Sequence, residues 1–125
     1  MNVIKTEKAP LPIGPYSQAI KAGDFLFVSG QAPLDPKTKK VVEGDIEIQT
    51  NQTIENLKSI LAASGMSLVN VVRVGIFLRD MKDFKKMNEV YGTYFKDHPP
   101  ARTTVQAYLP APEWLIEMDA IASSE

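Results

Sequence analysis

The spacing of apolar and polar positions predicts a first amphipathic helix between residues 45 and 65. Asp45 is a suitable N-cap, and Gly65 stands where a helix commonly ends on a left-handed residue. Between them an apolar stripe recurs at intervals of three and four positions, and it consists of Thr50, Ile54, Leu57, Ile60 and Leu61. One face of this helix is therefore expected to lie on the hydrophobic core.

A second helix is predicted from about Asp83 to the pair Pro99 and Pro100, because proline cannot continue a helix. Its apolar face consists of Phe84, Met87, Val90, Tyr91, Tyr94 and Phe95. Gly92 lies inside this helix, where it costs about 1 kcal/mol relative to alanine. We expect that the helix at Gly92 packs closely against a sheet.

Short apolar or alternating runs bounded by turn-forming residues predict about six strands. They cover residues 16–21 and 25–28 as a hairpin, a short strand at 41–42, a central strand at 71–78, and two last strands at 102–108 and 115–122. Both alternating faces of the central strand are largely apolar, so we expect both to be covered. Two helices cover only one face of such a sheet, and the other is expected to pack on a second copy of the chain.

Composition and charge narrow the class of protein. The 125 residues, 44% of them hydrophobic and 23% charged, suit one globular domain over residues 1–125. The net charge of −1 offers no basic surface to a nucleic acid, so a nucleic-acid partner is disfavoured. Neither a signal-peptide segment nor an apolar run long enough to span a membrane is present, and a cytoplasmic protein is expected.

The residue types exclude several kinds of active site. The chain has no cysteine and one histidine, which leaves no thiolate nucleophile, no Ser-His-Asp triad and no metal site rich in histidine or thiolate. No glycine-rich phosphate loop follows a strand, and no cofactor is expected. The single histidine, His98, stands at a helix end, where a positive charge suits the helix dipole, and it is better explained as a surface residue.

Arg102 and Glu117 are the candidate functional residues. Arg102 begins a strand, and its guanidinium is suited to bind a carboxylate through two parallel hydrogen bonds, although a surface ion pair explains this arginine about equally well. Glu117 lies on an alternating strand; if both faces of that strand are covered, Glu117 is partly buried, and burial raises the pKa of a carboxyl as acid–base catalysis requires. An exposed polar face of an edge strand is the alternative for Glu117.

Five segments together resemble the reactive-intermediate deaminase family RidA, also called YjgF. They are residues 13–18, 29–31, 83–91, 100–103 and 116–122, and they occur in the family order over nearly the whole chain. The resemblance implies a chorismate-mutase-like α+β fold, a mixed sheet of about six strands with two helices on one face, which assembles into homotrimers with sites between subunits. It also implies cofactor-free hydrolysis of 2-imino acids, such as 2-iminobutanoate and 2-iminopropanoate, to 2-keto acids and ammonia.

The same resemblance implies roles for individual residues. By matching position, Arg102 would bind the substrate carboxylate, and Glu117 would hold and deprotonate the water. Further pocket residues would be Tyr16, Ser29, Gly30, Asn88 and Thr104. Thr104 stands where many relatives have a cysteine, which excludes thiol-dependent chemistry but leaves its backbone carbonyl able to contact water. The turn before Glu117 is bulkier than in many relatives, and its Trp114 either reshapes the pocket or fills an interface.

Other functions stay open at the level of sequence. A regulatory module could bind small carboxylates without turnover. A chorismate-mutase-like catalyst would need more than one cation in its pocket, and Arg102 has no arginine neighbour in sequence. RNA cleavage has also been attached to the family, and the net charge argues against it.

Overall fold

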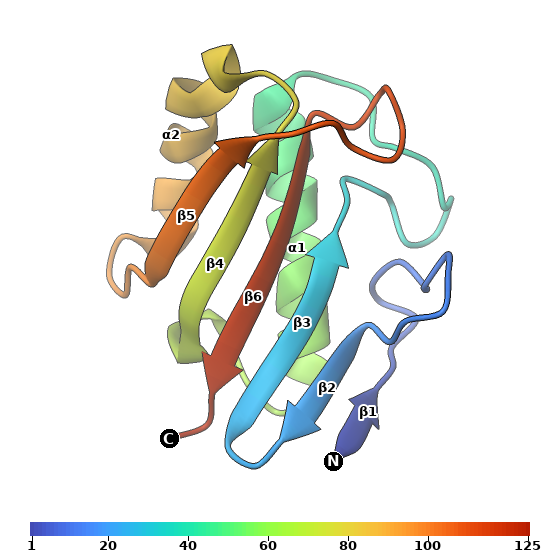
Figure 1. Ribbon diagram of the computed structural model, residues 1–125, viewed down its shortest axis with the longest axis vertical. Helices are drawn as coiled ribbons and strands as arrows, with labels where there is room; N and C mark the ends of the chain where they lie inside the picture. The colour runs from blue at the N-terminus through green and yellow to red at the C-terminus, as the bar shows by residue number, and fades with distance from the viewer.

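Two helices lie on one face of a six-stranded sheet in the computed structural model, which describes residues 1–125 (Figure 1). The strands are β1 (Asn2–Ile4), β2 (Ala19–Ala22), β3 (Phe25–Gln31), β4 (Val71–Leu78), β5 (Ala101–Gln106) and β6 (Ile116–Ser123). The helices are α1 (Ile46–Ala63) and α2 (Phe84–Phe95), with single 3₁₀ turns at Leu68–Asn70 and Met81–Asp83. This arrangement confirms the predicted α+β fold with both helices on one face.

The sheet order, β1-β2-β3-β6-β4-β5, places the last strand of the chain in the middle of the sheet. Only β4 and β5 pair in parallel, and α2 is the crossover that connects them. β5 is consequently an edge strand that lies beside α2 (Figure 1). The central position of β6 sets Glu117 between β3 and β4, whereas Arg102 lies at the edge of the sheet.

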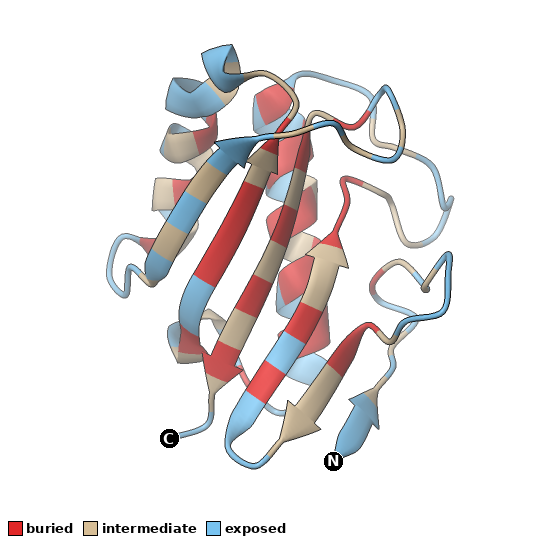
Figure 2. Ribbon diagram, in the orientation of Figure 1, coloured by how far each residue is buried: buried red, intermediate tan, exposed pale blue.

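The first helix has the ends that its sequence predicts. The Asp45 carboxylate accepts hydrogen bonds from the backbone N–H groups of Glu47 and Ile48, at 3.0 and 3.2 Å. Gly65 follows the helix with a φ of +79°, which is the left-handed conformation that glycine adopts without strain. The five residues of the predicted stripe are all fully buried, and the four aliphatic ones belong to the hydrophobic core (Figure 2).

The second helix begins where predicted and ends at Phe95, a few residues before Pro99 and Pro100, and its glycine is not in close contact with the sheet. Met87, Tyr91 and Phe95 are the buried side chains of its inner face. A Cβ atom added at Gly92 would meet no heavy atom within 4 Å, so nothing in the chain requires a glycine there. The expectation of close packing at Gly92 is therefore wrong, because the sequence shows the helical position but not the distance to its neighbours.

We expect Gly92→Ala to raise the free energy of unfolding by about 0.5–1 kcal/mol, because alanine restricts the unfolded chain and favours the helix. Urea unfolding followed by circular dichroism measures this change. Gly65→Ala is the matched control, since its positive φ strains any residue with a Cβ atom, and this variant should be destabilised. Destabilisation by Gly92→Ala would show that the helix has a close neighbour at this position.

The sheet has one covered and one open face. Val74, Ile76 and Leu78 of β4 are fully buried under the helices. On the opposite face, Phe25 and Phe27 are 45% and 47% exposed (Figure 2). Within one chain the central strand is thus covered on one side only, as the count of two helices suggested. No helix is both long and apolar enough to cross a membrane.

The predicted strand at residues 41–42 is reduced to one isolated bridge between Leu34 and Val41. The two prolines of this segment, Pro33 and Pro36, lack the N–H groups that a longer ladder would need. The segment between β3 and α1 is otherwise a loop.

Candidate functional site

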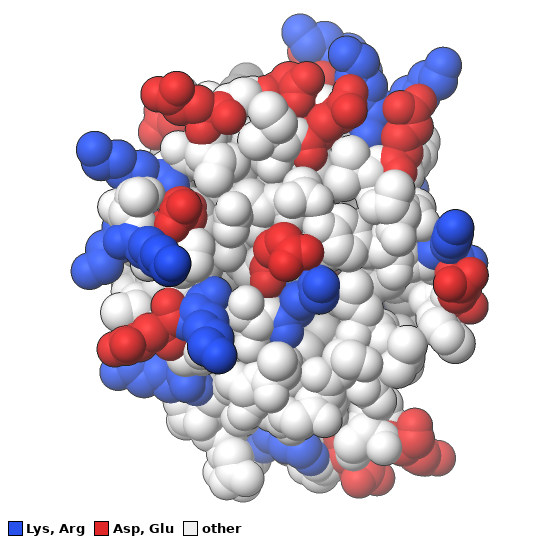
Figure 3. Space-filling model, turned by 180° about the vertical axis from the view of Figure 1, so that it is seen from behind, with Lys and Arg blue, Asp and Glu red and all other residues white.

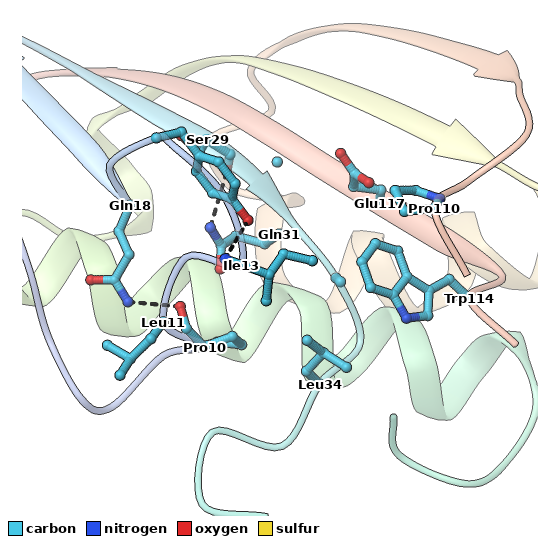
Figure 4. A pocket seen from close by; sticks show the side chains of 13 residues that line it. Pro10, Leu11, Ile13, Gln18, Ser29, Gln31, Leu34, Pro110, Trp114 and Glu117 are labelled. Carbon is cyan, nitrogen blue, oxygen red and sulfur yellow. Dashed lines mark hydrogen bonds between the residues drawn. The ribbon is translucent and has the colours of Figure 1, made fainter. Parts of the chain in front are cut away.

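A pocket of about 390 Å³ lies between the end of β3, the start of β6 and the N-terminal loop (Figure 4). Its polar side chains and backbone come from Tyr16, Gln18, Ser29, Gly30, Gln31 and Glu117. Its apolar wall comes mainly from Pro10, Leu11, Ile13, Leu34, Pro110 and Trp114. Four of the residues predicted from the sequence, Tyr16, Ser29, Gly30 and Glu117, are therefore neighbours in this pocket.

A β-bulge in β3 shapes the pocket beside Glu117. The pairing of β3 with β6 shifts between Val28 and Gln31, so the bulge contains Ser29 and Gly30. A side chain at Gly30 would collide with the Glu117 carboxyl group. Because glycine has no side chain, the carboxyl group can occupy this space. The Ser29 hydroxyl donates a hydrogen bond to the Ser17 carbonyl at 2.6 Å and so attaches the bulge to the N-terminal loop.

The Glu117 carboxyl group is partly buried and has neither a hydrogen-bond donor nor a cation beside it in its own chain. Removal from water raises the pKa of Glu117, and the negative charge of Asp119, two positions along the same face of β6, raises it further. A carboxyl group in this environment exchanges protons at a higher pH than an exposed glutamate. Such a group is suited to general acid–base chemistry.

We expect Glu117→Gln to increase the free energy of unfolding at neutral pH, because the pocket disfavours the charged carboxylate. The folded-state pKa of Glu117 lies above its unfolded value, so protonation stabilises the fold at low pH and this contribution is lost as the pH rises through the raised pKa. The advantage of the variant should thus be absent in acid and grow toward neutral pH. Urea unfolding of both proteins from about pH 4 to pH 8 measures it.

Glu89→Gln, which removes an exposed carboxylate from α2, is the control for the loss of a surface charge. Its effect on the free energy of unfolding should not follow the Glu117→Gln pH profile. A pH-independent difference between wild type and Glu117→Gln would contradict the raised pKa.

Two residues hold the N-terminal loop against the pocket. The Tyr16 hydroxyl accepts a hydrogen bond from the Ile13 N–H at 3.2 Å, and the ring, 47% exposed, lines the pocket. The buried Gln18 amide donates to the Pro10 carbonyl at 2.8 Å and accepts from the Thr6 N–H at 2.8 Å. Gln18 could not be predicted as a site residue, because a glutamine before a strand has no local feature that marks it as buried.

Arg102 belongs to a different group of residues, on the side of β5 that faces α2. Its guanidinium carbon lies 4.8 Å from the Tyr91 ring centroid and 5.7 Å from that of Phe84. The only ion pairs of the chain join Lys58 to Glu55 and Lys82 to Asp80, so Arg102 has no carboxylate partner. The ion-pair explanation of Arg102 is not supported within the chain, and its charge is available for an anion.

Three polar atoms without partners lie on the facing sides of α2 and β5, as Arg102 does. Asn88 Oδ1, the Tyr91 hydroxyl and Thr104 Oγ1 are buried and make no hydrogen bond. Asn88 lies between Phe84 and Tyr91 on one face of α2, and Thr104 shares the helix-facing side of β5 with Arg102. Burial raises the pKa of Tyr91, and the positive charge of Arg102 opposes this rise. Unpartnered buried atoms are costly, so these three atoms are suited to contact a bound molecule or a second chain.

Arg102 and Glu117 lie on opposite faces of the sheet. Arg102 is paired with Val74, which is buried beneath the helices, whereas Glu117 is paired with Phe77 on the open face. Successive side chains of a strand alternate between faces, so this register separates the two groups. The predicted site residues thus form two groups, the Glu117 group with Tyr16, Ser29 and Gly30, and the Arg102 group with Asn88 and Thr104.

Lysine and arginine side chains are interspersed with aspartate and glutamate on the helical face, and no continuous basic surface is visible there (Figure 3). This distribution agrees with the net charge of −1. A polyanion such as RNA would find no extended positive surface on this face.

Comparison with known proteins relates residues 6–124 to the family described as Endoribonuclease L-PSP. A RutC family protein of Pyrococcus horikoshii is 57% identical over 124 residues, which cover 99% of this chain and 98% of the relative. Reactive Intermediate Deaminase A, chloroplastic, of Arabidopsis thaliana is 46% identical over 98% of this chain and 65% of the relative. The crystal structure of E. coli TdcF with bound serine has a TM-score of 0.94 and 36% identity, and it covers 100% of both chains.

Proposed function

The chain belongs to the Endoribonuclease L-PSP family, which includes the RidA and YjgF proteins, and we propose that it is a hydrolytic deaminase of small 2-imino acids. The substrates we propose are 2-iminobutanoate and 2-iminopropanoate, and the products are the corresponding 2-keto acids and ammonia. The family includes reactive intermediate deaminases, which supports a deaminase. The observation that carries the proposal is an arginine, Arg102, held over two aromatic rings with no carboxylate partner in its own chain.

Arg102 binds the substrate carboxylate in this proposal. The planar guanidinium makes two parallel hydrogen bonds to a carboxylate, and the rings of Tyr91 and Phe84 limit its movement. The unpartnered atoms of Asn88 and Thr104 provide further polar contacts for the small polar substrate. TdcF, the similar protein of known structure, was crystallised with serine, which also carries a carboxylate and a nitrogen on the adjacent carbon.

Glu117 supplies the acid–base chemistry. The iminium carbon is electrophilic, so water adds to it without a side-chain nucleophile when the Glu117 carboxylate accepts a proton from the water. The protonated Glu117 then returns this proton to the nitrogen of the tetrahedral adduct. As the C–N bond breaks, the carbonyl forms from the adduct hydroxyl, whose proton leaves on the released ammonia as ammonium. The protonated 2-imino acid and one water thus become a 2-keto acid and ammonium, and Glu117 regains its starting charge.

The two groups of residues can meet only when two copies of the chain associate. The Glu117 group of one copy must face the Arg102 group of the next copy. Each contact between copies therefore joins two different surfaces of the chain. Contacts of this kind close into rings, and the proposal is a homotrimer with three such sites. The open sheet face with its exposed Phe25 and Phe27 provides apolar area for this association.

The proposed substrates are short-lived in water, so the enzyme must act in the compartment in which they are released. We therefore propose a cytoplasmic protein that acts beside the pyridoxal-phosphate-dependent dehydratases which release these imines. No cofactor is needed by the chemistry assigned to Arg102 and Glu117.

The test is a coupled assay with a threonine dehydratase as the source of 2-iminobutanoate and semicarbazide as the trap for residual imine. Purified wild-type protein should lower the trapped fraction in proportion to its concentration. Trapping that is unchanged while 2-oxobutanoate still binds would instead identify a regulatory module for small carboxylates. Incubation with RNA in parallel tests the ribonuclease activity that the family description names, and we expect the RNA to stay intact.

A further inference from the structure

Trp114 forms one wall of the Glu117 pocket. The side chain is 7% exposed in a single chain, and Figure 4 shows its indole facing the pocket beside Glu117 and Pro110. The sequence left two roles open for Trp114, shaping the pocket or filling an interface. The burial supports the first role, because the side chain is already covered within a single chain.

The backbone of Trp114 is fixed on both sides by buried or partly buried side chains. The Arg79 guanidinium donates hydrogen bonds to the carbonyls of Trp114 and Ala111, at 2.7 and 2.6 Å. The buried Gln49 amide of α1 donates to the Glu113 carbonyl at 2.9 Å and accepts from the Leu115 N–H at 2.8 Å. Hydrogen bonds to a charged donor are strong, so the backbone that carries the buried indole is held in place.

The opposite wall of the pocket is also apolar. Ile13 and Leu34 lie across the pocket from Trp114, and Glu117 lies beside this apolar part of the pocket, next to Pro110 (Figure 4). A substrate with its reacting carbon at Glu117 therefore directs its side chain between Trp114 and these two aliphatic residues. The volume of about 390 Å³ is near the lower limit of ligand pockets, which span about 300–1,000 Å³.

We propose that Trp114 limits the size of the substrate side chain, so that the pocket accepts short aliphatic 2-imino acids and excludes aromatic ones. The inference rests on the proposed function in one respect, since the ligands are taken to be 2-imino acids and their 2-keto acid products. The role of the wall itself follows from the burial of Trp114 and from the hydrogen bonds of Arg79 and Gln49.

The test compares binding of 2-oxobutanoate and 3-phenyl-2-oxopropanoate by isothermal titration calorimetry. Wild-type protein should bind 2-oxobutanoate at least about tenfold more tightly, because an apolar pocket discriminates by roughly 10–200-fold per methylene group. Trp114→Ala should reduce this ratio by about tenfold or more, mainly through tighter binding of the aromatic ligand. An unchanged ratio would overturn the proposal.

Two further variants keep the test decisive. Tyr108→Ala removes an aromatic side chain from the same connection between β5 and β6, but Tyr108 is 98% exposed and outside the pocket, so the ratio should equal that of wild type. Trp114→Phe retains an aromatic wall and should shift the ratio in the same direction by a smaller factor. If Trp114→Ala does not fold, the binding ratio of Trp114→Phe tests the proposal in its place.

Turnover of the two corresponding 2-imino acids is measured in addition to binding. An amino acid oxidase with catalase generates these imines from amino acids. The two measurements together test the size limit and the deaminase activity separately. A shift in the binding ratio without turnover by any variant would retain Trp114 as the size limit and refute the deaminase. Turnover by wild type with no shift in the ratio would refute the size limit and retain the deaminase.

Discussion

Arg102→Ala is expected to lower kcat/KM for 2-iminobutanoate by a factor of about ten to a hundred or more, because loss of one charge-assisted hydrogen bond costs roughly 1.5–3 kcal/mol. Arg102→Lys should not restore the rate. The lysine ammonium is a point charge without the planar fork, and it would not stack on the Tyr91 and Phe84 rings as the guanidinium does. Initial rates in the coupled semicarbazide assay measure both variants.

The matched control is Lys86→Ala, which removes one positive charge from the exposed face of α2. Its kcat/KM should stay at the wild-type value, which would exclude a general effect of charge. Circular dichroism and sedimentation of each variant establish that fold and assembly are retained. An Arg102→Ala protein that is assembled and fully active would remove Arg102 from the site.

Mixed oligomers of Arg102→Ala and Glu117→Gln chains are expected to regain activity that neither variant has alone. Glu117→Gln alone should lose about 10²–10⁴-fold, the usual contribution of an acid–base group. In a randomly mixed ring of equal amounts, about one quarter of the contacts join an intact Arg102 to an intact Glu117, so about one quarter of the wild-type rate should return. Unfolding and refolding the two chains together, followed by the coupled assay, measures this recovery.

Separately refolded chains, combined without exchange, are the control and should stay inactive. Absence of recovery in mixtures that native mass spectrometry shows to be mixed oligomers would place both groups of residues in a site of one chain. That result would contradict the register of β4, β5 and β6, which sets Arg102 and Glu117 on opposite faces. The experiment therefore tests the assembly and the pairing of the strands together.

Much of the fold could be predicted because its signals are local. The Asp45 cap, the Gly65 end and the apolar stripe between them lie within a few turns of one helix, and each acts on its neighbours in sequence. Alternation along β6 likewise separates buried Ile116 and Met118 from partly buried Glu117. These features need no knowledge of the rest of the chain.

The site could be predicted only as a set of residue types. Which face of the sheet Arg102 occupies depends on its pairing with Val74, 28 positions earlier, and nothing near Arg102 in sequence determines that pairing. The role of Gln49 is similar, since its amide binds backbone groups of residues 113 and 115. Contacts across such separations are set by the tertiary fold, and the local pattern of the sequence does not contain them.

The separation of Arg102 and Glu117 across the sheet has a consequence for how the protein responds to dilution. If each site needs two chains, a dissociated chain has the complete fold but only half of the groups for turnover. The rate per chain should then fall once the protein is diluted below its dissociation constant, although its circular dichroism spectrum would not change. The amount of protein in a cell would thereby determine both how many sites exist and how active each chain is.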